Sequence, residues 1–128
     1  MGQLGKDKKV LIADDSMVVH KLMEKVFASM GFDICCQAKN GREAVEGFKA
    51  HNPDLVFLDI TMPIVDGIRA LRRIINHNPE AKVIMLSAMS DNEIVEQALS
   101  IGAKNFISKP FQAEKVKAAV EEVFNGGE

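Results

Sequence analysis

Residues 54–63 read Asp54-Leu55-Val56-Phe57-Leu58-Asp59-Ile60-Thr61-Met62-Pro63. Residues 55–58 form an unbroken apolar run, which is typical of a strand buried on both faces. Thr61, Pro63 and the nearby Gly67 supply loop residues, so the strand is expected to end at the Asp59 carboxylate. Open α/β sheets bind ligands at the carboxyl ends of their strands. The sequence therefore places Asp59 on the edge of the sheet where a binding site is expected.

The rest of the chain repeats the pattern of a short apolar strand followed by a helix. The other predicted strands are residues 8–13, 33–38, 83–86 and 105–108, and each is followed by apolar residues at helical spacing. Ser16 is expected to cap the first helix and Gly31 to end it, while Asp91 opens the fourth. Five strands that alternate with five helices predict an α/β fold of three layers, with a parallel sheet covered on both faces.

The composition is that of a single soluble domain. The chain has 128 residues, of which 47% are hydrophobic and 27% charged. A net charge of −2 offers no basic surface for nucleic acid, and no apolar run approaches the ~20 residues of a membrane span. Cys35 and Cys36 are adjacent in a predicted strand, where their side chains point to opposite faces, so free thiols are expected. With no signal segment, the expected location is the cytoplasm.

Polar side chains stand at or just after the ends of four predicted strands. Asp14 and Asp15 follow the first, Asp59 ends the third, Ser87 follows the fourth and Lys109 follows the fifth. Each has an ordinary explanation as a turn, cap or surface residue, but in a parallel sheet all of them share one edge. Three neighbouring carboxylates need a counter-charge, and Mg²⁺ prefers oxygen ligands. An acid nucleophile, a cation, a lysine and a hydroxyl are the groups that stabilise phosphoryl transfer.

The chain resembles the receiver domain of two-component response regulators, most closely the single-domain chemotaxis type. The resemblance runs from about Lys8 to Phe124 and rests on five motifs: Val10-Leu11-Ile12-Ala13-Asp14-Asp15-Ser16, Leu58-Asp59-Ile60-Thr61-Met62-Pro63 with Asp66-Gly67, Leu86-Ser87-Ala88, Gly102-Ala103-Lys104 and Lys109-Pro110-Phe111. It implies a flavodoxin-like (βα)5 fold with strand order 2-1-3-4-5. It also implies that residues 1–128 form a single receiver domain with a core of about residues 8–124.

The resemblance implies roles for the residues at the strand ends. Asp59 is the phosphoacceptor, which takes a phosphoryl group from a histidine kinase or phosphotransfer protein. Mg²⁺ is held directly by Asp15, Asp59 and the main-chain carbonyl of Thr61, and through water by Asp14. Lys109 pairs with the phosphoryl oxygens.

The resemblance also implies a conformational switch. The Ser87 hydroxyl moves to bind the phosphoryl group, and Phe106 fills the space that it vacates, unless Phe106 is an ordinary core aromatic. The face formed by the fourth helix, fifth strand and fifth helix then changes shape and docks a target protein. Pro110 matches a proline that often follows a cis peptide bond. Met89 and Thr61 flank the path of the hydrolytic water, and because Met89 cannot orient water, slow self-dephosphorylation is expected.

Three other interpretations compete with this one. An aspartyl phosphohydrolase of the haloacid-dehalogenase type needs Asp-x-Asp after the first strand, but Asp14 and Asp15 are adjacent. A flavodoxin-like cofactor carrier needs stacking aromatics, and the chain has no Trp or Tyr. A receiver cut from a longer regulator is the third. We expect a signalling switch rather than an enzyme, acting as a monomer, with chemotaxis as the pathway that the resemblance favours.

Overall fold

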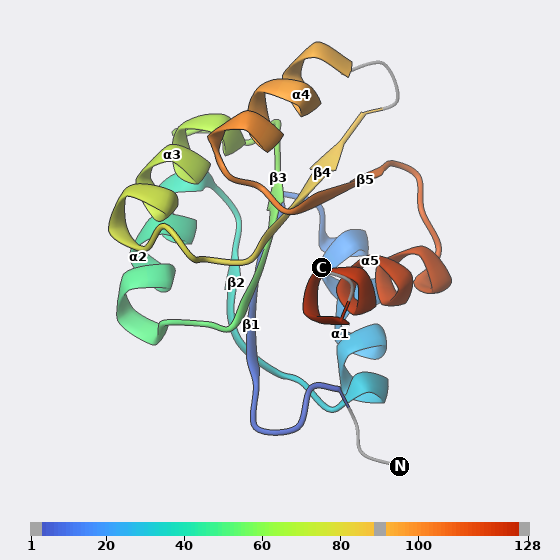
Figure 1. The fold of residues 1–128 in the computed structure, drawn as a ribbon. Helices are drawn as coiled ribbons and strands as arrows, with labels where there is room; N and C mark the ends of the chain where they lie inside the picture. Colours follow the sequence, from blue (N-terminus) through green and yellow to red (C-terminus); the bar gives the residue numbers. More distant parts are fainter. Residues whose placement is uncertain (1–3, 89–91, 126–128) are drawn as a thin grey trace.

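The computed structural model describes residues 4–88 and 92–125, which form one parallel sheet with helices on both faces (Figure 1). The sheet has five strands in the order β2-β1-β3-β4-β5, as the resemblance implied. The strands are β1 (Lys9–Ala13), β2 (Asp33–Ala38), β3 (Leu55–Asp59), β4 (Val83–Ser87) and β5 (Asn105–Ser108). The helices are α1 (Met17–Met30), α2 (Gly41–His51), α3 (Gly67–His77), α4 (Asn92–Ile101) and α5 (Ala113–Asn125).

The helices divide into two layers because the crossovers are right-handed and the chain crosses the sheet in both directions. Connections that run in opposite directions place their helices on opposite faces. Helices α1 and α5 cover one face of the sheet, and α2, α3 and α4 cover the other (Figure 1). Strands β3 and β4 are buried along their whole length, which explains their unbroken apolar sequences. Strand β2 lies at an edge and carries Cys35 and Cys36, both half-buried free thiols as expected.

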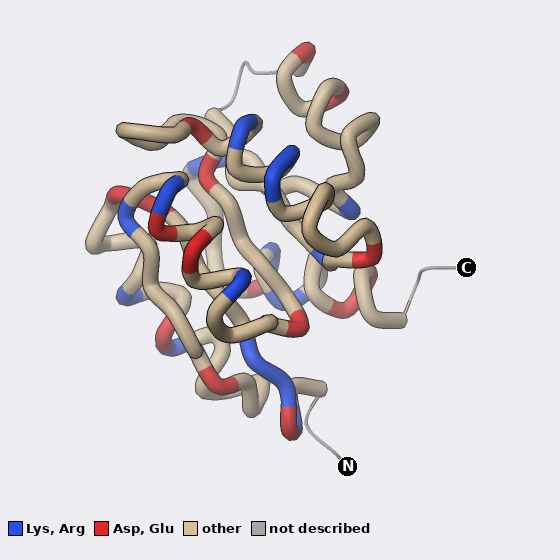
Figure 2. The backbone as a smooth tube through the Cα atoms, turned by 90° about the vertical axis from the view of Figure 1, so that its left-hand side faces the viewer, with Lys and Arg blue, Asp and Glu red and all other residues tan. Residues whose placement is uncertain are grey.

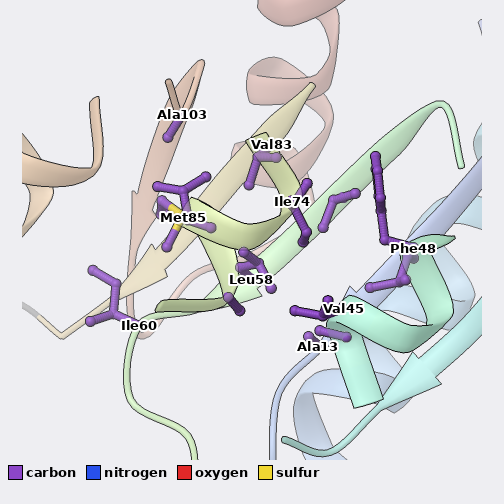
Figure 3. Close-up of a cluster of buried hydrophobic side chains, with 14 of the residues drawn as sticks. Ala13, Val45, Phe48, Leu58, Ile60, Ile74, Val83, Met85 and Ala103 are labelled. Carbon is purple, nitrogen blue, oxygen red and sulfur yellow. The ribbon is translucent and has the colours of Figure 1, made fainter. Parts of the chain in front are cut away.

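Alternate side chains of each central strand enter different halves of the core. Val56 and Leu58 of β3 pack with Phe48 of α2 and Ile74 of α3, in the layer drawn in Figure 3. Residues 55 and 57 of the same strand pack instead against α1 and α5. This alternation follows from the two-residue period of a strand. The fold is therefore held by two apolar layers that meet at the sheet.

The helix boundaries follow the predicted signals closely. Ser16 caps α1 by accepting a hydrogen bond from the Val19 N–H at 3.4 Å, and Gly31 ends that helix with a φ of 84°. The first strand begins at Lys9, one residue later than predicted, which is within the usual fraying of element ends. Asp91, predicted to open the fourth helix, lies outside the described residues.

The charged residues are distributed over several elements. Figure 2 shows Lys and Arg interspersed with Asp and Glu along the backbone, in keeping with the net charge of −2. Within residues 4–88 and 92–125, no helix has the length and apolar character that crossing a membrane requires.

Candidate acidic site at the carboxyl ends of the strands

Three carboxylates meet where strands β1 and β3 end. The two strands pair in parallel with Ala13 opposite Leu58, so the following Asp14 and Asp59 become neighbours. Single carboxylate oxygens of Asp14, Asp15 and Asp59 lie within 4.8 Å of one another. Asp14 and Asp59 are 0% and 5% exposed, whereas Asp15 is exposed. The cluster is therefore buried on one side and open to solvent at Asp15.

Lys109 supplies a positive charge to this cluster. Its Nζ lies 2.8 Å from Asp14 Oδ2 and 3.0 Å from Asp59 Oδ2. The lysine directly follows β5, and its main-chain N–H donates to the Ser87 carbonyl oxygen at 2.7 Å. That bond holds the Lys109 main chain beside the end of β4. From this position the Lys109 side chain reaches both acids. The Lys109–Pro110 peptide bond is cis.

Burial and charge act on the two ionisable partners in opposite ways. Burial raises the pKa of Asp59, and the neighbouring Asp14 charge raises it further, against the opposing effects of Lys109 and the Thr61 N–H. For Lys109, burial lowers the pKa, but the hydrogen bonds and charges of Asp14 and Asp59 outweigh it, so the pKa is raised. The ammonium stays charged, yet one ammonium faces two buried carboxylates and Asp15. This excess of negative charge, carried on oxygen atoms, fits a hard divalent cation such as Mg²⁺.

The backbone after Asp59 is fixed by close contacts. The Thr61 N–H donates to Asp59 Oδ1 at 3.2 Å, which places the Thr61 main chain beside the carboxylate. Gly67 donates its N–H to the Ile60 carbonyl oxygen at 2.8 Å. A Cβ at Gly67 would lie only 2.1 Å from the Asp59 carbonyl oxygen. The sequence marks Gly67 as part of a motif but does not by itself predict this steric role. A glycine eight residues after a strand-end acid is the signal that could suggest it.

Ser87 and Phe106 occupy contrasting environments. Ser87 ends β4 and is 1% exposed, and its Oγ has no hydrogen-bond partner within the part of the chain that the structure describes. Phe106 on β5 is 41% exposed, so it is not an ordinary core aromatic. Met89, expected to affect dephosphorylation, lies outside the described residues.

Sequence reasoning missed one buried polar residue at the site. His20 of α1 is 3% exposed, and its ring contacts the main chain of Asp14 at 2.7 Å. A histidine within a predicted apolar helix stripe, six residues after a strand-end acid, was the available signal. The apolar residues that predict this stripe give no indication of a polar contact at position 20.

The family model of the response regulator receiver domain matches residues 10–121. The chain belongs to this family. This receiver is 43% identical to the chemotaxis protein CheY of Bacillus subtilis over 117 residues, which are 91% of this chain and 98% of the relative. It is 42% identical to the chemotaxis protein CheY of Thermotoga maritima over 116 residues, covering 91% of this chain and 97% of the relative.

Comparison with solved structures points to the same family as the sequence relatives. The receiver resembles a chain in the crystal structure of the CheX-CheY-BeF3-Mg²⁺ complex from Borrelia burgdorferi, with a TM-score of 0.87 and 44% identity. The match covers 91% of this chain and 89% of that one. The receiver is thus a CheY-like response regulator domain of two-component signalling, with the flavodoxin-like fold that the resemblance implied. Domains of this family act as signalling switches and generally bind Mg²⁺.

Proposed function

We propose that the receiver accepts a phosphoryl group on Asp59 from a phosphohistidine of a histidine kinase or phosphotransfer protein. The observation that carries the proposal is the buried Asp59 carboxylate at the end of β3, in contact with the Lys109 ammonium and within reach of two further acids. A carboxylate oxygen of Asp59 attacks phosphorus, the phosphorus–nitrogen bond breaks, and the imidazole leaves with its electron pair. Lys109 stays in the site as a fixed positive charge beside the phosphoryl oxygens.

The acids around Asp59 are proposed to hold Mg²⁺. Asp15, Asp59 and the main-chain carbonyl of Thr61 would bind the ion directly, and Asp14 would hold it through water. The ion supplies positive charge to the phosphoryl oxygens during transfer. Support comes from the three clustered carboxylates with a single ammonium, and from the Thr61 N–H bond that keeps this main chain beside Asp59. The similar chain from Borrelia burgdorferi comes from a crystal structure described as a complex that contains BeF3 and Mg²⁺.

Phosphorylation is proposed to be read through a switch. Ser87 Oγ, which has no hydrogen-bond partner within residues 4–88 and 92–125, would turn to the phosphoryl group. Phe106 would then move from its exposed position into the vacated space, since its ring is apolar and 41% exposed. The target protein would dock on the α4-β5-α5 face, to which Phe106 belongs as a residue of β5.

Relatives of the chain support a biological setting. We propose a role in chemotaxis, because the two relatives described above are both named chemotaxis proteins. The receiver is proposed to act as a cytoplasmic monomer and as a single domain over residues 1–128. It assists its own phosphorylation and loses the phosphoryl group slowly, the latter because of Met89.

A mass measurement tests the chemistry. The protein is incubated with Mg²⁺ and a small phosphodonor, and Asp59→Asn is treated in parallel. Wild type should gain one phosphoryl group and Asp59→Asn none, because the amide is not a nucleophile of comparable strength. Equal labelling of both proteins would contradict the assignment of Asp59. Steady turnover of a phosphoester would favour a phosphohydrolase instead.

A further inference from the structure

A buried histidine joins the acidic site to helix α1. His20 lies in the first turn of this helix, on the side that also buries Met23 and Phe27. Its Nε2 lies 2.7 Å from the Asp14 carbonyl oxygen and 3.2 Å from the Ala38 carbonyl oxygen. Carbonyl oxygens only accept hydrogen bonds, so Nε2 carries the hydrogen and donates it.

This contact fixes the peptide from which the acids leave the sheet. The Asp14 N–H donates to the same Ala38 carbonyl oxygen at 3.0 Å, and Asp14 Oδ1 accepts from the Ser16 N–H at 2.8 Å. The Asp14 carbonyl belongs to the peptide unit that continues into Asp15. His20 therefore sets the orientation of that peptide plane, at the point where the ends of β1 and β2 meet α1.

Asp15 depends on this orientation more than Asp14 does. The Asp14 carboxylate is held by Lys109 and the Ser16 N–H. The Asp15 carboxylate is exposed, and none of residues 4–88 or 92–125 donates a hydrogen bond to it. Its place within the cluster is therefore set by the main chain that carries it.

Packing alone does not account for a histidine at this position. His20 Nδ1 is buried and has no hydrogen-bond partner among the described residues. A buried polar atom without a partner costs free energy that an apolar side chain of similar size would avoid. The hydrogen bond donated by Nε2 is what the histidine provides and an apolar residue would not.

We propose that His20 is a positioning residue for the cation site: its Nε2–H fixes the Asp14–Asp15 peptide and so holds the Asp15 carboxylate toward Asp59. This inference rests on the proposed function, because it takes Asp15 and Asp59 as ligands of Mg²⁺. Groups that orient metal ligands without touching the metal commonly have large effects on affinity.

Two variants of matched length separate the donated hydrogen bond from the space that the ring fills. His20→Gln places an amide N–H near the Nε2 position, and His20→Met offers a side chain of the same length without a donor. Mg²⁺ affinity is measured by calorimetry well below the Tm of each protein, with no phosphodonor present. His20→Met should weaken Mg²⁺ binding about tenfold, and His20→Gln should stay within about twofold of wild type.

A third variant controls for loss of stability. Val26→Ala removes apolar volume from the same buried side of α1, away from the strand ends. It should lower the Tm and leave Mg²⁺ affinity unchanged. Any of three results would overturn the role of His20 while leaving the proposed metal site standing. These are wild-type Mg²⁺ affinity in His20→Met, equal weakening of Mg²⁺ binding in His20→Gln and His20→Met, or weakening of Mg²⁺ binding in Val26→Ala. Absence of Mg²⁺ binding by wild type would overturn the proposed metal site, and the role of His20 with it.

Discussion

At the scale of single residues, the site holds more buried negative charge than the protein itself neutralises. Lys109 lies within 3.0 Å of two carboxylates, but it carries only one charge. The pKa of Asp59 is raised by burial in spite of this contact. Ionisation of this buried carboxylate therefore reduces the stability of the fold, which is common where chemistry needs a charge in a fixed place.

A pH titration of stability should reveal this cost. With EDTA present, the raised pKa means that the folded protein binds a proton on Asp59 more tightly than the unfolded chain, whose Asp pKa is ordinarily 3.8. The stabilising contribution is present below that value and is lost as pH rises through the raised pKa of the folded state. The Tm of wild type should therefore fall relative to Asp59→Asn as the pH rises above about 4. The Tm of both proteins is measured by circular dichroism at several pH values. A difference in Tm that does not change with pH would contradict the raised pKa of Asp59.

The residues at the site differ in how far the sequence could predict them. Asp14, Asp59 and Lys109 could be placed together because each follows an apolar strand and parallel strands share an edge. Their roles as metal ligands and phosphoacceptor stay predictions. The different exposure of Asp14 and Asp15 could not be predicted, since it depends on which way a chain turns after its last strand residue. His20 carries a sequence signal only as a polar residue on a buried helix face, since its partners are backbone carbonyls whose positions cannot be read from the sequence.

At the scale of elements, the loop between β3 and α3 is tightly constrained. It brings the first residue of α3 against the main chain of Asp59, so that only a glycine fits at position 67. It also holds Ile64 at a φ of 70° with 66% of its surface exposed. A β-branched residue is rare in this left-handed conformation, so the loop stores strain next to Asp59.

Gly67→Ala should damage both the fold and the site. The new Cβ would approach the Asp59 carbonyl oxygen, a backbone atom that cannot move independently of the strand. We expect a loss of about 2–3 kcal/mol in the free energy of unfolding, measured by urea denaturation, and slower phosphorylation of Asp59. Gly47→Ala is the matched control, because its Cβ would mainly meet the Sγ of Cys36, the end of a movable side chain. That control should stay within about 1 kcal/mol of wild type.

Ile64→Asn should stabilise the receiver. Asparagine adopts the left-handed conformation at lower cost than a β-branched residue, so the Tm should rise by an amount equivalent to about 1 kcal/mol. Ile64→Thr separates backbone strain from polarity, because threonine is polar but still β-branched. An equal rise in Tm for both variants would show that surface polarity, rather than the φ of 70°, is responsible.

Element types could be predicted from local patterns, whereas this strain could not. The apolar runs, the Ser16 cap and the Gly31 stop are signals read within a few residues. The conformation of Ile64 results from closing the loop between a buried strand and a capped helix. Nothing in the residue itself indicates a positive φ, and its side chain argues against one.

At the scale of the whole molecule, the alternation of strands and helices was sufficient to predict the layers. It was not sufficient for the strand order, which came from the family resemblance and is confirmed by the structure. Several strand orders are compatible with right-handed crossovers, since that rule fixes the handedness of a connection and not the edge of the sheet to which the next strand is added. The proposed switch would connect distant parts of this arrangement, because Asp59 lies on the central strand and Phe106 on an edge strand.

Fluorine NMR should follow the switch directly. A fluorophenylalanine placed at position 106 reports solvent contact through the difference between its resonances in H₂O and D₂O. Adding Mg²⁺ and beryllium fluoride should reduce that difference, since the exposed ring of Phe106 moves into the space left by Ser87. The same label in an Asp59→Asn background should show no change. An unchanged label in wild type that binds beryllium fluoride would contradict the coupling.

Helix α4 is attached to the rest of the molecule by little apolar surface. Of its described residues only Val95 and Ala98 are buried, and Ile94 and Leu99 are more than a third exposed. Most positions along this helix can therefore be exchanged without disturbing either half of the core. Substitutions on this helix can change the surface that it presents to a binding partner while the acidic cluster around Asp59 stays as it is.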